Sequence, residues 1–191
     1  GFREGLAVFC QSVSSEAALN QFGAAAIPGA ILGALANRLK VVDWVKRHPD
    51  VSKERIAAPF VTVGIFRAGT TLLSYLLEKD PRHRPLYRWE AGDCTPPPTP
   101  GTIANDPRIE TTRASMAMMD PINPRMRVVQ SEEPDGPTEC ISVMNQDFKS
   151  LTWEAMANVP AYGKWLYGAD HRSAYAYHKT VLQVLQSGGV R

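Results

Sequence analysis

The chain has 191 residues, of which 44% are hydrophobic and 21% are charged, and its formal net charge is +2. This length is sufficient for one well-buried domain or for part of a larger one, and the composition is too apolar for a disordered chain. Lysine and arginine are spread along the sequence, which argues against a dedicated nucleic-acid surface. The cysteines, Cys10, Cys94 and Cys140, form no metal-ligand pair, so we expect no metal site and reduced thiols in a cytoplasmic protein.

Residues 1–56 are predicted to form an N-terminal helical segment. Leu35 and Leu39 belong to an apolar stripe with helical spacing, and Pro49 ends the run. The most apolar stretch, residues 23–36, is too short by itself to cross a bilayer. The N-terminus also lacks the basic-then-apolar order of a signal peptide. We therefore expect no membrane span.

Residues 57–95 are predicted to contain a strand, a glycine loop and a helix. The segment 60–63 is Phe-Val-Thr-Val, which indicates a buried strand, and Gly64 and Gly69 then follow with P-loop spacing. The helix is predicted to begin at Thr70 and to end at Pro81, with one apolar face made of Leu72, Leu73, Leu76 and Leu77. A strand, a glycine loop and a helix in this order are typical of a phosphate-binding site.

Residues 96–191 are predicted to be mostly helical. Helices are expected over 105–119 and 173–186, and Ile141, Met144, Phe148 and Leu151 also recur at helical spacing. In the first of these helices, Met116 and Met119 are expected to face the core. The methionine group either packs in the core or lines an apolar acceptor pocket; its members are Met116, Met118, Met119 and Met126.

The glycine loop lacks the lysine that follows the second glycine in nucleotide triphosphatases. Thr70 occupies that position, and the cation, Arg67, lies earlier within the loop. Glycines allow the backbone N–H groups to converge on an anion at the start of a helix, and the hydroxyls of Thr70 and Thr71 add donors. A guanidinium binds phosphate or sulfate oxygens in a bidentate manner without a metal ion. The loop therefore suits a single 5′-phosphate next to a transferred group.

The loop with its preceding strand resembles the phosphosulfate-binding loop of the sulfotransferases that use 3′-phosphoadenosine 5′-phosphosulfate (PAPS), specifically the bacterial-type group. The likeness covers essentially the whole chain and includes further motifs in order: Asn37-Arg-Leu39, Arg47-His-Pro49, Leu76-Leu-Glu-Lys-Asp-Pro81, Arg88-Trp-Glu90, Pro96-Pro-Pro98, Glu133-Pro-Asp-Gly-Pro-Thr-Glu-Cys140 and Ala174-Tyr-Ala-Tyr-His178. The chain departs from the family pattern at Ala68, where serine is usual, and at Phe66, where proline is usual. The resemblance implies that PAPS is the cofactor, bound by Arg67, Ala68, Gly69, Thr70 and Thr71.

The same resemblance implies an α/β, P-loop-like sulfotransferase fold with a parallel sheet flanked by helices. This chain is expected to be its N-terminal portion, mostly helical, and to hold only the first strand, loop and helix of the sheet. The helical segment 96–191 is then expected to cover the acceptor site. The residues that bind the 3′-phosphate are expected in the C-terminal half of the domain, outside this chain.

Sulfuryl transfer to a hydroxyl acceptor also needs a base. Glu90, in the motif Arg88-Trp-Glu90, lies near the position at which the resemblance places the catalytic glutamate, and Trp89 beside it favours a raised proton affinity. A purely structural carboxylate paired with Arg84 or Arg88 is the alternative. With Arg67 stabilising the departing phosphate, Glu90 and Arg67 are the predicted catalytic residues.

Other titratable residues are assigned weaker interpretations. His83 is the rival base, but it lies in a basic stretch that is typical of an exposed surface. Glu139 stands at a predicted helix start, where a carboxylate is favourable for structural reasons alone. His171 and His178 are assigned no role.

Two other classes of function stay open from the sequence. One is a kinase or nucleotide triphosphatase with a degenerate P-loop, which requires Mg²⁺-dependent nucleotide binding. The other is a non-catalytic helical binding module in which the loop serves only for packing. The sequence predicts a small-molecule hydroxyl acceptor but neither its identity nor the oligomeric state.

Overall fold

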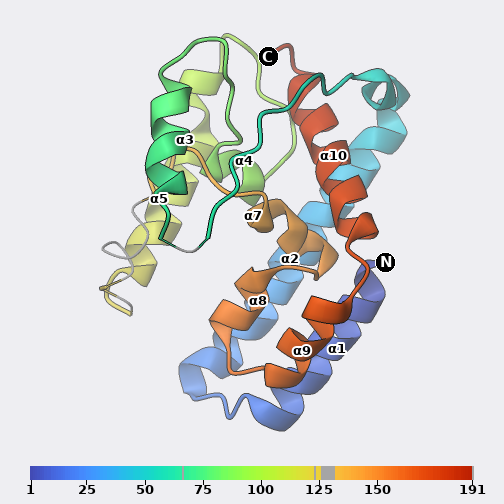
Figure 1. The fold of residues 1–191 in the computed structure, drawn as a ribbon, viewed down its shortest axis with the longest axis vertical. Helices are drawn as coiled ribbons and strands as arrows, with labels where there is room; N and C mark the ends of the chain where they lie inside the picture. Colours follow the sequence, from blue (N-terminus) through green and yellow to red (C-terminus); the bar gives the residue numbers. More distant parts are fainter. Residues whose placement is uncertain (66, 123, 126–131, 191) are drawn as a thin grey trace.

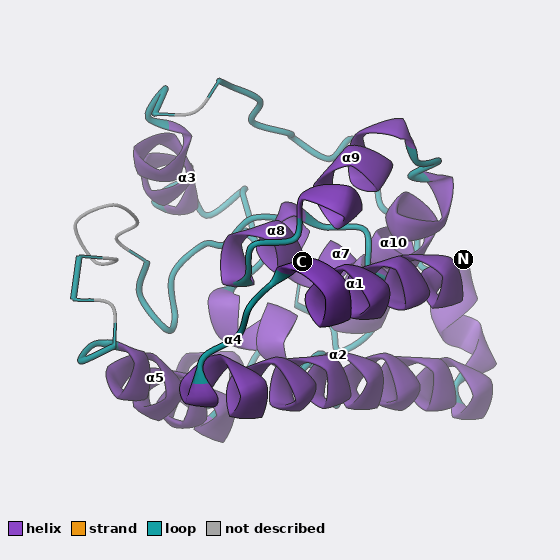
Figure 2. Ribbon diagram, turned by 90° about the horizontal axis from the view of Figure 1, so that it is seen from below, coloured by secondary structure: helices purple, strands orange, loops and turns teal. Residues whose placement is uncertain are grey.

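The computed structural model describes residues 1–65, 67–122, 124–125 and 132–190, and in these ranges the chain is helical (Figures 1 and 2). The α-helices are α1 (Phe2–Glu16), α2 (Gln21–Arg47), α3 (Thr70–Glu78), α4 (Arg88–Gly92), α5 (Pro107–Met119), α7 (Ile141–Met144), α8 (Leu151–Met156), α9 (Pro160–Gly168) and α10 (Arg172–Gln186). Short 3₁₀ helices are η1 (Pro49–Lys53), η2 (Ile103–Asn105) and η3 (Asn145–Asp147). The predicted helical character of 1–56, 105–119 and 173–186 is thereby confirmed, apart from a break between α1 and α2 and shifts of one or two residues at the helix ends.

One hydrophobic cluster, the Trp153 core, joins α1 and the N-terminal part of α2 to α8 and α9. The indole ring of Trp153 stacks on Phe148 with centroids 4.9 Å apart, and Phe9 of α1 lies 4.7 Å from the same indole. The buried members of the Trp153 core are Phe9, Ile27, Ala34, Phe148, Trp153, Val159, Tyr162 and Leu166. Large apolar side chains that lose contact with water in this way contribute most of the stability of a helical domain.

A second cluster, the Val181 core, packs α10 against the C-terminal part of α2, η1, α4 and α7. Its buried members are Val41, Val51, Ala91, Cys94, Val143, Tyr177, Val181, Val184 and Leu185. The sequence predicts an apolar face on the last helix made of Ala174, Val181, Leu182 and Leu185; Leu182 is half-buried and the other three are buried. Helix α2 supplies residues to both cores, so both clusters pack against the same helix (Figure 1).

Helix α1 also satisfies the first amides of α9. The hydroxyl of Ser12 accepts a hydrogen bond from the amide of Tyr162 at 3.3 Å, and the carboxylate of Glu16 accepts one from the amide of Ala161 at 3.1 Å. The first N–H groups of a helix have no acceptor within that helix. Pro160 begins α9 without an N–H of its own, so the contacts from α1 cap the two donors that follow it.

Helix α2 contains the apolar run 23–36 but is longer than that run. It has 27 residues, and with a mean hydropathy of 1.3 over 18 residues it is long and apolar enough to cross a membrane by length and composition alone, as the core helix of a soluble protein also can be. One side of the helix contributes Ile27, Ala34 and Val41 to the two cores. Leu32 and Leu39 lie on its exposed side.

The predicted strand at 60–63 and the parallel sheet are wrong for this structure. No strand is formed in the described ranges. Within them, Tyr87 and Pro137 form an isolated antiparallel β-bridge. A strand needs a neighbouring strand to accept and donate its backbone hydrogen bonds. Phe60, Val61 and Val63 keep the composition of a buried strand, yet they are 66%, 71% and 88% exposed.

The apolar spacing over 141–151 does not produce one helix. Helix α7 ends at Met144, Phe148 has a left-handed backbone with φ of 55°, and α8 begins only after Ser150, whose hydroxyl accepts a hydrogen bond from the amide of Thr152. The buried phenol of Tyr162 hydrogen-bonds to the carbonyl groups of Phe148 and Ser150 and so holds the chain in the turn between α7 and α8.

Two expectations for the methionines fail or fall outside the described residues. Met119 was expected to face the core but is 50% exposed, and Met118 is 74% exposed, while Met116 is half-buried. Helix α5 lies at the periphery, next to α4, and its outer side therefore faces solvent (Figure 2). Met126 is outside the described part of the chain.

Candidate active site

The glycine loop between residues 64 and 69 folds back on itself. A Cβ at Gly64 would lie 3.0 Å from the methyl group of Thr70 and 3.2 Å from the Cβ of Ala68, so a larger residue there requires these side chains to shift. Gly69 has φ of 86°, a conformation that glycine adopts without a steric penalty. The first glycine therefore allows the close approach of Thr70 and Ala68, and the second allows the left-handed backbone.

Arg67 also adopts a left-handed backbone, with φ of 67°. This conformation is costly for a residue with a Cβ, by about 1 kcal/mol, and such residues cluster at functional sites. Arg67 is exposed at the surface of the loop. The strain is an observed backbone outlier within the motif that the sequence singled out.

Helix α3 begins directly after the loop, at Thr70. The first amides of a helix have no acceptor within it, and together with the helix dipole they form a site of positive potential. Thr70 and Thr71 are half-buried at this end. The amide of Ala68 differs from them, because it donates to the carbonyl of Ile65 at 3.1 Å and is thus used within the loop.

The remainder of α3 contacts the rest of the chain through polar side chains. The phenol of Tyr75 accepts a hydrogen bond of 2.9 Å from the amide of Glu133. Burial raises the pKa of the phenols of Tyr75 and Tyr87, and the negative charge of Glu78 adds to this at both residues. Tyr87 is the N-cap of α4, so the carboxylate of Glu78 on α3 acts electrostatically on the start of the helix that carries Glu90.

The segment 132–138 lies along the residues that lead into α4. The amide of Arg88 donates to the carbonyl of Gly136 at 3.0 Å, and that of Trp89 donates to Pro134 at 3.2 Å. The amide of Thr138 returns a bond of 2.8 Å to the carbonyl of Leu86. The Arg88 side chain forms an ion pair with Glu132. These contacts fix the start of α4.

Glu90 is completely buried in the first turn of α4. One carboxylate oxygen accepts a hydrogen bond from the amide of Tyr87 at 3.1 Å, and the other is paired with the guanidinium of Arg84. Burial raises the pKa of Glu90, and the positive charge of Arg84 opposes that increase. Of the two arginines considered from sequence as structural partners, Arg84 binds Glu90, whereas Arg88 binds Glu132.

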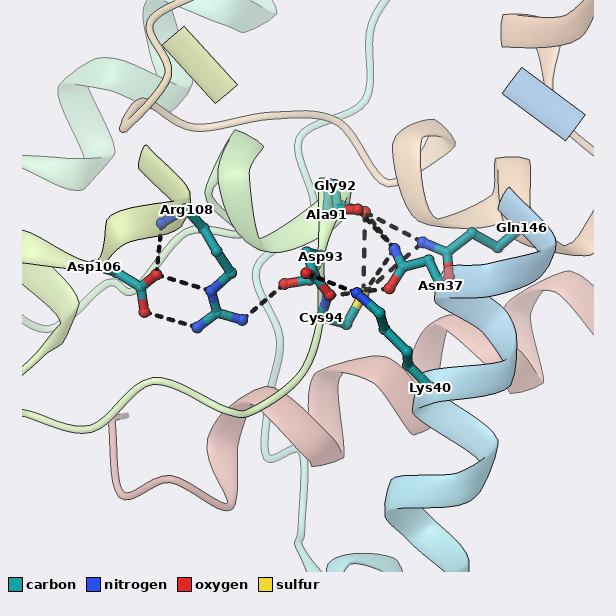
Figure 3. Close-up of polar contacts among 9 residues, drawn as sticks. All are labelled: Asn37, Lys40, Ala91, Gly92, Asp93, Cys94, Asp106, Arg108 and Gln146. Atoms are coloured by element: carbon teal, nitrogen blue, oxygen red, sulfur yellow. Dashed lines mark hydrogen bonds and ion pairs between the residues drawn. The ribbon is translucent and has the colours of Figure 1, made fainter. Parts of the chain in front are cut away.

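Two buried side-chain amides hold the C-terminal end of α4 (Figure 3). The Nδ2 of Asn37, on α2, donates to the carbonyl of Gly92 at 2.9 Å, and its Oδ1 accepts from the amide of Cys94 at 3.2 Å. The Nε2 of Gln146 donates to the carbonyl of Ala91 at 3.2 Å. Buried polar groups that are satisfied in this way confer a unique position on the element they bind.

Arg108 at the start of α5 contacts α4 from another direction (Figure 3). Its guanidinium is held by the carboxylate of Asp106 at 2.7 Å, donates to the carbonyl of Asp93 at 2.8 Å, and lies 4.6 Å from the centre of the Trp89 ring. The guanidinium holds the pKa of Asp106 below its usual range. The two residues next to Glu90 in sequence are thus fixed, Trp89 by Arg108 and Ala91 by Gln146.

The other candidates do not join this group. His83 is half-exposed, with a ring nitrogen 3.7 Å from the carboxylate of Asp80. Glu139 is exposed and precedes α7. A ring nitrogen of His171 contacts the carbonyl of Leu166 at 3.0 Å. Burial lowers the pKa of His178, which lies on α10, the helix that contributes Val181 to the second core.

Hollows and clusters elsewhere on the described surface do not involve the loop. A hollow of about 450 Å³ is lined by α2 residues around Leu39, and one of about 430 Å³ lies between α1 and α2; neither is lined by a loop or α4 residue. In the described part of the chain, no group of three or more His, Cys, Asp or Glu residues converges as a metal site would require. Cys10, Cys94 and Cys140 are free thiols.

Sequence reasoning missed the residues that connect the loop helix to α4. Tyr75 lies within the predicted helix. Glu133 and Gly136 lie within a motif that resembles the sulfotransferase family but indicates no contact with this helix. Their contact joins residues 58 positions apart, and no local pattern in the sequence indicates it. Asn37 was likewise quoted without a role, although a polar residue on the inner side of an apolar helix is a usable signal of a buried hydrogen bond.

Comparison with known proteins identifies relatives of this arrangement. The sequence model described as the sulfotransferase family matches residues 59–185. The crystal structure of sulfotransferase STF9 from Mycobacterium avium has 35% sequence identity and a TM-score of 0.87, with 98% of this chain and 48% of that chain covered. The crystal structure of sulfotransferase STF1 from Mycobacterium tuberculosis H37Rv has 29% identity and a TM-score of 0.84, with 99% and 52% covered.

The present chain thus spans about half the length of these two solved structures. No curated protein matches the chain at a significant level.

Proposed function

This chain belongs to the sulfotransferase family, and on that premise we propose that it carries the phosphosulfate-binding loop and the general base of a PAPS-dependent sulfotransferase. The observation that carries the proposal is the loop itself. Gly64 and Gly69 let the backbone curl, and Arg67 is held in a strained conformation immediately before the N-terminus of α3. The first N–H groups of α3 lie directly after this turn, which suits a tetrahedral anion bound by backbone N–H groups.

Within this proposal, Arg67, Gly69, Thr70 and Thr71 bind the 5′-phosphate end of the donor, which supplies the sulfuryl group when bound. Ala68 contributes backbone to the same turn, but its amide already bonds to Ile65. The guanidinium of Arg67 takes the place of the positive charge that a lysine and Mg²⁺ provide in nucleotide triphosphatases. It stabilises the negative charge that develops on the leaving phosphate oxygen.

Glu90 is proposed to accept the proton of the acceptor hydroxyl while the hydroxyl oxygen bonds to sulfur and the bond from sulfur to the phosphate oxygen breaks. A buried carboxylate with a raised pKa suits a base that works near neutral pH. Arg84, whose side chain is 15% exposed, is paired with the completely buried carboxylate of Glu90. Proton transfer to Glu90 is therefore proposed to require a change in this pairing.

The binding half of the proposal is tested by thermal shift of the protein at its natural length. We expect 3′,5′-ADP, the product of the donor, to raise the melting temperature without added Mg²⁺. Arg67→Ala is expected to weaken binding about 10- to 100-fold, since a charge-assisted hydrogen bond contributes about 1.5–3 kcal/mol. Arg172→Ala, which changes an exposed arginine paired with Asp170, is the matched control and is expected to bind normally.

A response to Mg-ATP in place of 3′,5′-ADP would instead support the kinase or triphosphatase class. Absence of a response to either nucleotide would support the non-catalytic binding module.

The catalytic half is tested by turnover of Glu90→Gln with PAPS and a panel of small hydroxyl acceptors. Glutamine retains the size of the side chain and an oxygen that accepts from Tyr87, but it cannot take a proton. We expect kcat to fall about 10²- to 10⁴-fold with binding of 3′,5′-ADP unchanged. Turnover close to that of the unmodified protein would show that Glu90 serves only to cap α4 and to pair with Arg84.

A further inference from the structure

We propose that Tyr75 and Gly136 are positioning residues that set the phosphate loop at a fixed distance from Glu90. This inference rests on the function proposed above and adds residues to it that touch neither the donor nor the acceptor. The segment 132–138, here called the connecting segment, contacts the loop helix on one side and α4 on the other. Its own placement therefore determines how the two parts of the site lie relative to each other.

On the loop side, Tyr75 provides a specific attachment. None of the residues of α3, all of which are described, is buried, so apolar packing within this chain does not fix the orientation of the helix. The phenol oxygen of Tyr75 accepts the amide of Glu133 at 2.9 Å. This contact ties α3 to the connecting segment, and one turn further along the charge of Glu78 acts on the phenol of Tyr87.

Gly136 provides the space for that attachment. A Cβ at Gly136 would lie 2.3 Å from the phenol oxygen of Tyr75 and 2.9 Å from the adjacent ring carbon. The backbone of Gly136 is outside the left-handed region that favours glycine, so its small size is needed for the Tyr75 ring and not for the turn. Gly136 is buried, so a Cβ at this position requires the Tyr75 phenol to leave its present place.

On the base side, the same segment holds the start of α4. The carbonyl of Gly136 accepts from Arg88, and that of Pro134 accepts from Trp89, the residue before Glu90. Gly136 thus contacts the Tyr75 ring and the first residue of α4 simultaneously. A displacement of about 1 Å between donor and base is sufficient to lower a transfer rate about 100-fold, so a rigid connection between them has a direct catalytic consequence.

The experiment combines Gly136→Ala, Tyr75→Phe and the double variant in the protein at its natural length. For Gly136→Ala we expect kcat to fall about 10-fold or more, with the dissociation constant of 3′,5′-ADP within about twofold of normal, because the loop itself is unchanged. Amide hydrogen exchange in α3 is expected to become faster while α10 is unaffected. In the Tyr75→Phe background, Gly136→Ala is expected to lower kcat and speed exchange by less, since the closest contact, which is to the phenol oxygen, is absent.

Matched controls are Gly101→Ala, where an added Cβ meets nothing within 4 Å, and Tyr167→Phe, where the ring is 78% exposed. Both are expected to leave kcat and exchange unchanged. Unaltered amide exchange in α3 of Gly136→Ala would overturn the inference. Faster exchange in α3 together with a normal kcat would also overturn it. So would a double variant in which the effects of Gly136→Ala and Tyr75→Phe on kcat and exchange are fully additive. If the unmodified protein transfers no sulfuryl group, the proposed function fails. The attachment of α3 is then tested by amide exchange alone, from whether the effects of Gly136→Ala and Tyr75→Phe on exchange in α3 are additive in the double variant.

Discussion

The helical body around Trp153 and the phosphate segment 59–80 use similar residues in opposite ways. In the body, Phe9, Trp153 and Tyr162 are fully buried and in mutual contact. In the phosphate segment, Val63 is 88% exposed and Leu72 is 65% exposed. Figure 1 shows α3 at the edge of the molecule, away from α8 and α9.

The difference shows that the two regions depend on different partners for their stability. The body buries large aromatic side chains within this chain. The phosphate segment presents strand-like and helical apolar faces that are typical of elements packed on both sides. Its attachment within this chain includes the hydrogen bond that the phenol of Tyr75 accepts from the amide of Glu133.

The largest expected effect comes from truncation of the body. Trp153→Ala removes a fully buried indole and a hydrogen bond of 3.0 Å to the carbonyl of Asn145, and we expect a loss of about 3–5 kcal/mol in the free energy of unfolding. Leu72→Ala is the matched truncation in the phosphate segment and is expected to cost less than about 0.5 kcal/mol in this chain. Urea unfolding of both variants of residues 1–191 measures the contrast, and comparable losses would refute it.

Substitution of glycines is expected to sharpen the comparison with a smaller effect. In the body, a Cβ at Gly5 would lie 2.3 Å from the carbonyl oxygen of Phe148, so Gly5→Ala is expected to destabilise the chain by about 1–3 kcal/mol. Gly69→Ala meets no atom within 4 Å but has φ of 86°, and we expect about 1 kcal/mol.

The two glycine variants are distinguished by ligand response. Gly5→Ala is expected to retain the thermal shift with 3′,5′-ADP, whereas Gly69→Ala is expected to lose most of it because the loop no longer curls correctly. Thermal unfolding with and without 3′,5′-ADP measures both effects. An equal ligand response in the two variants would show that the loop conformation is not specific for binding.

The helical elements were largely predictable from local pattern. The stripe of α10, with Val181 and Leu185 one turn apart, depends only on helical periodicity and on one apolar side. The spacing over 141–151 satisfied the same rule, but the backbone turns at Phe148, where φ is 55°, and the phenol of Tyr162 hydrogen-bonds to the carbonyls of Phe148 and Ser150 in that turn. Neither the turn nor the contact with Tyr162 is visible in the local apolar spacing.

The strand and the surroundings of Glu90 were harder to predict for a different reason. The composition of 60–63 gives a preference for extended backbone, but pairing depends on a neighbouring strand, which the described part of this chain does not form. Arg84 and Arg88 are both near Glu90 in sequence, and only the turn at Tyr87 decides which one contacts it. The loop glycines needed no such context, because their requirements are local.

The length of α2 has a consequence for how the chain loses its structure. One continuous helix supplies Ile27 and Ala34 to the Trp153 core and Val41 to the Val181 core. Because α2 is docked in both cores, a change in its packing in one core affects its packing in the other, which couples the free energies of the two. The helical body is therefore expected to melt as a single cooperative unit, while the phosphate segment opens and closes as a separate unit of low stability.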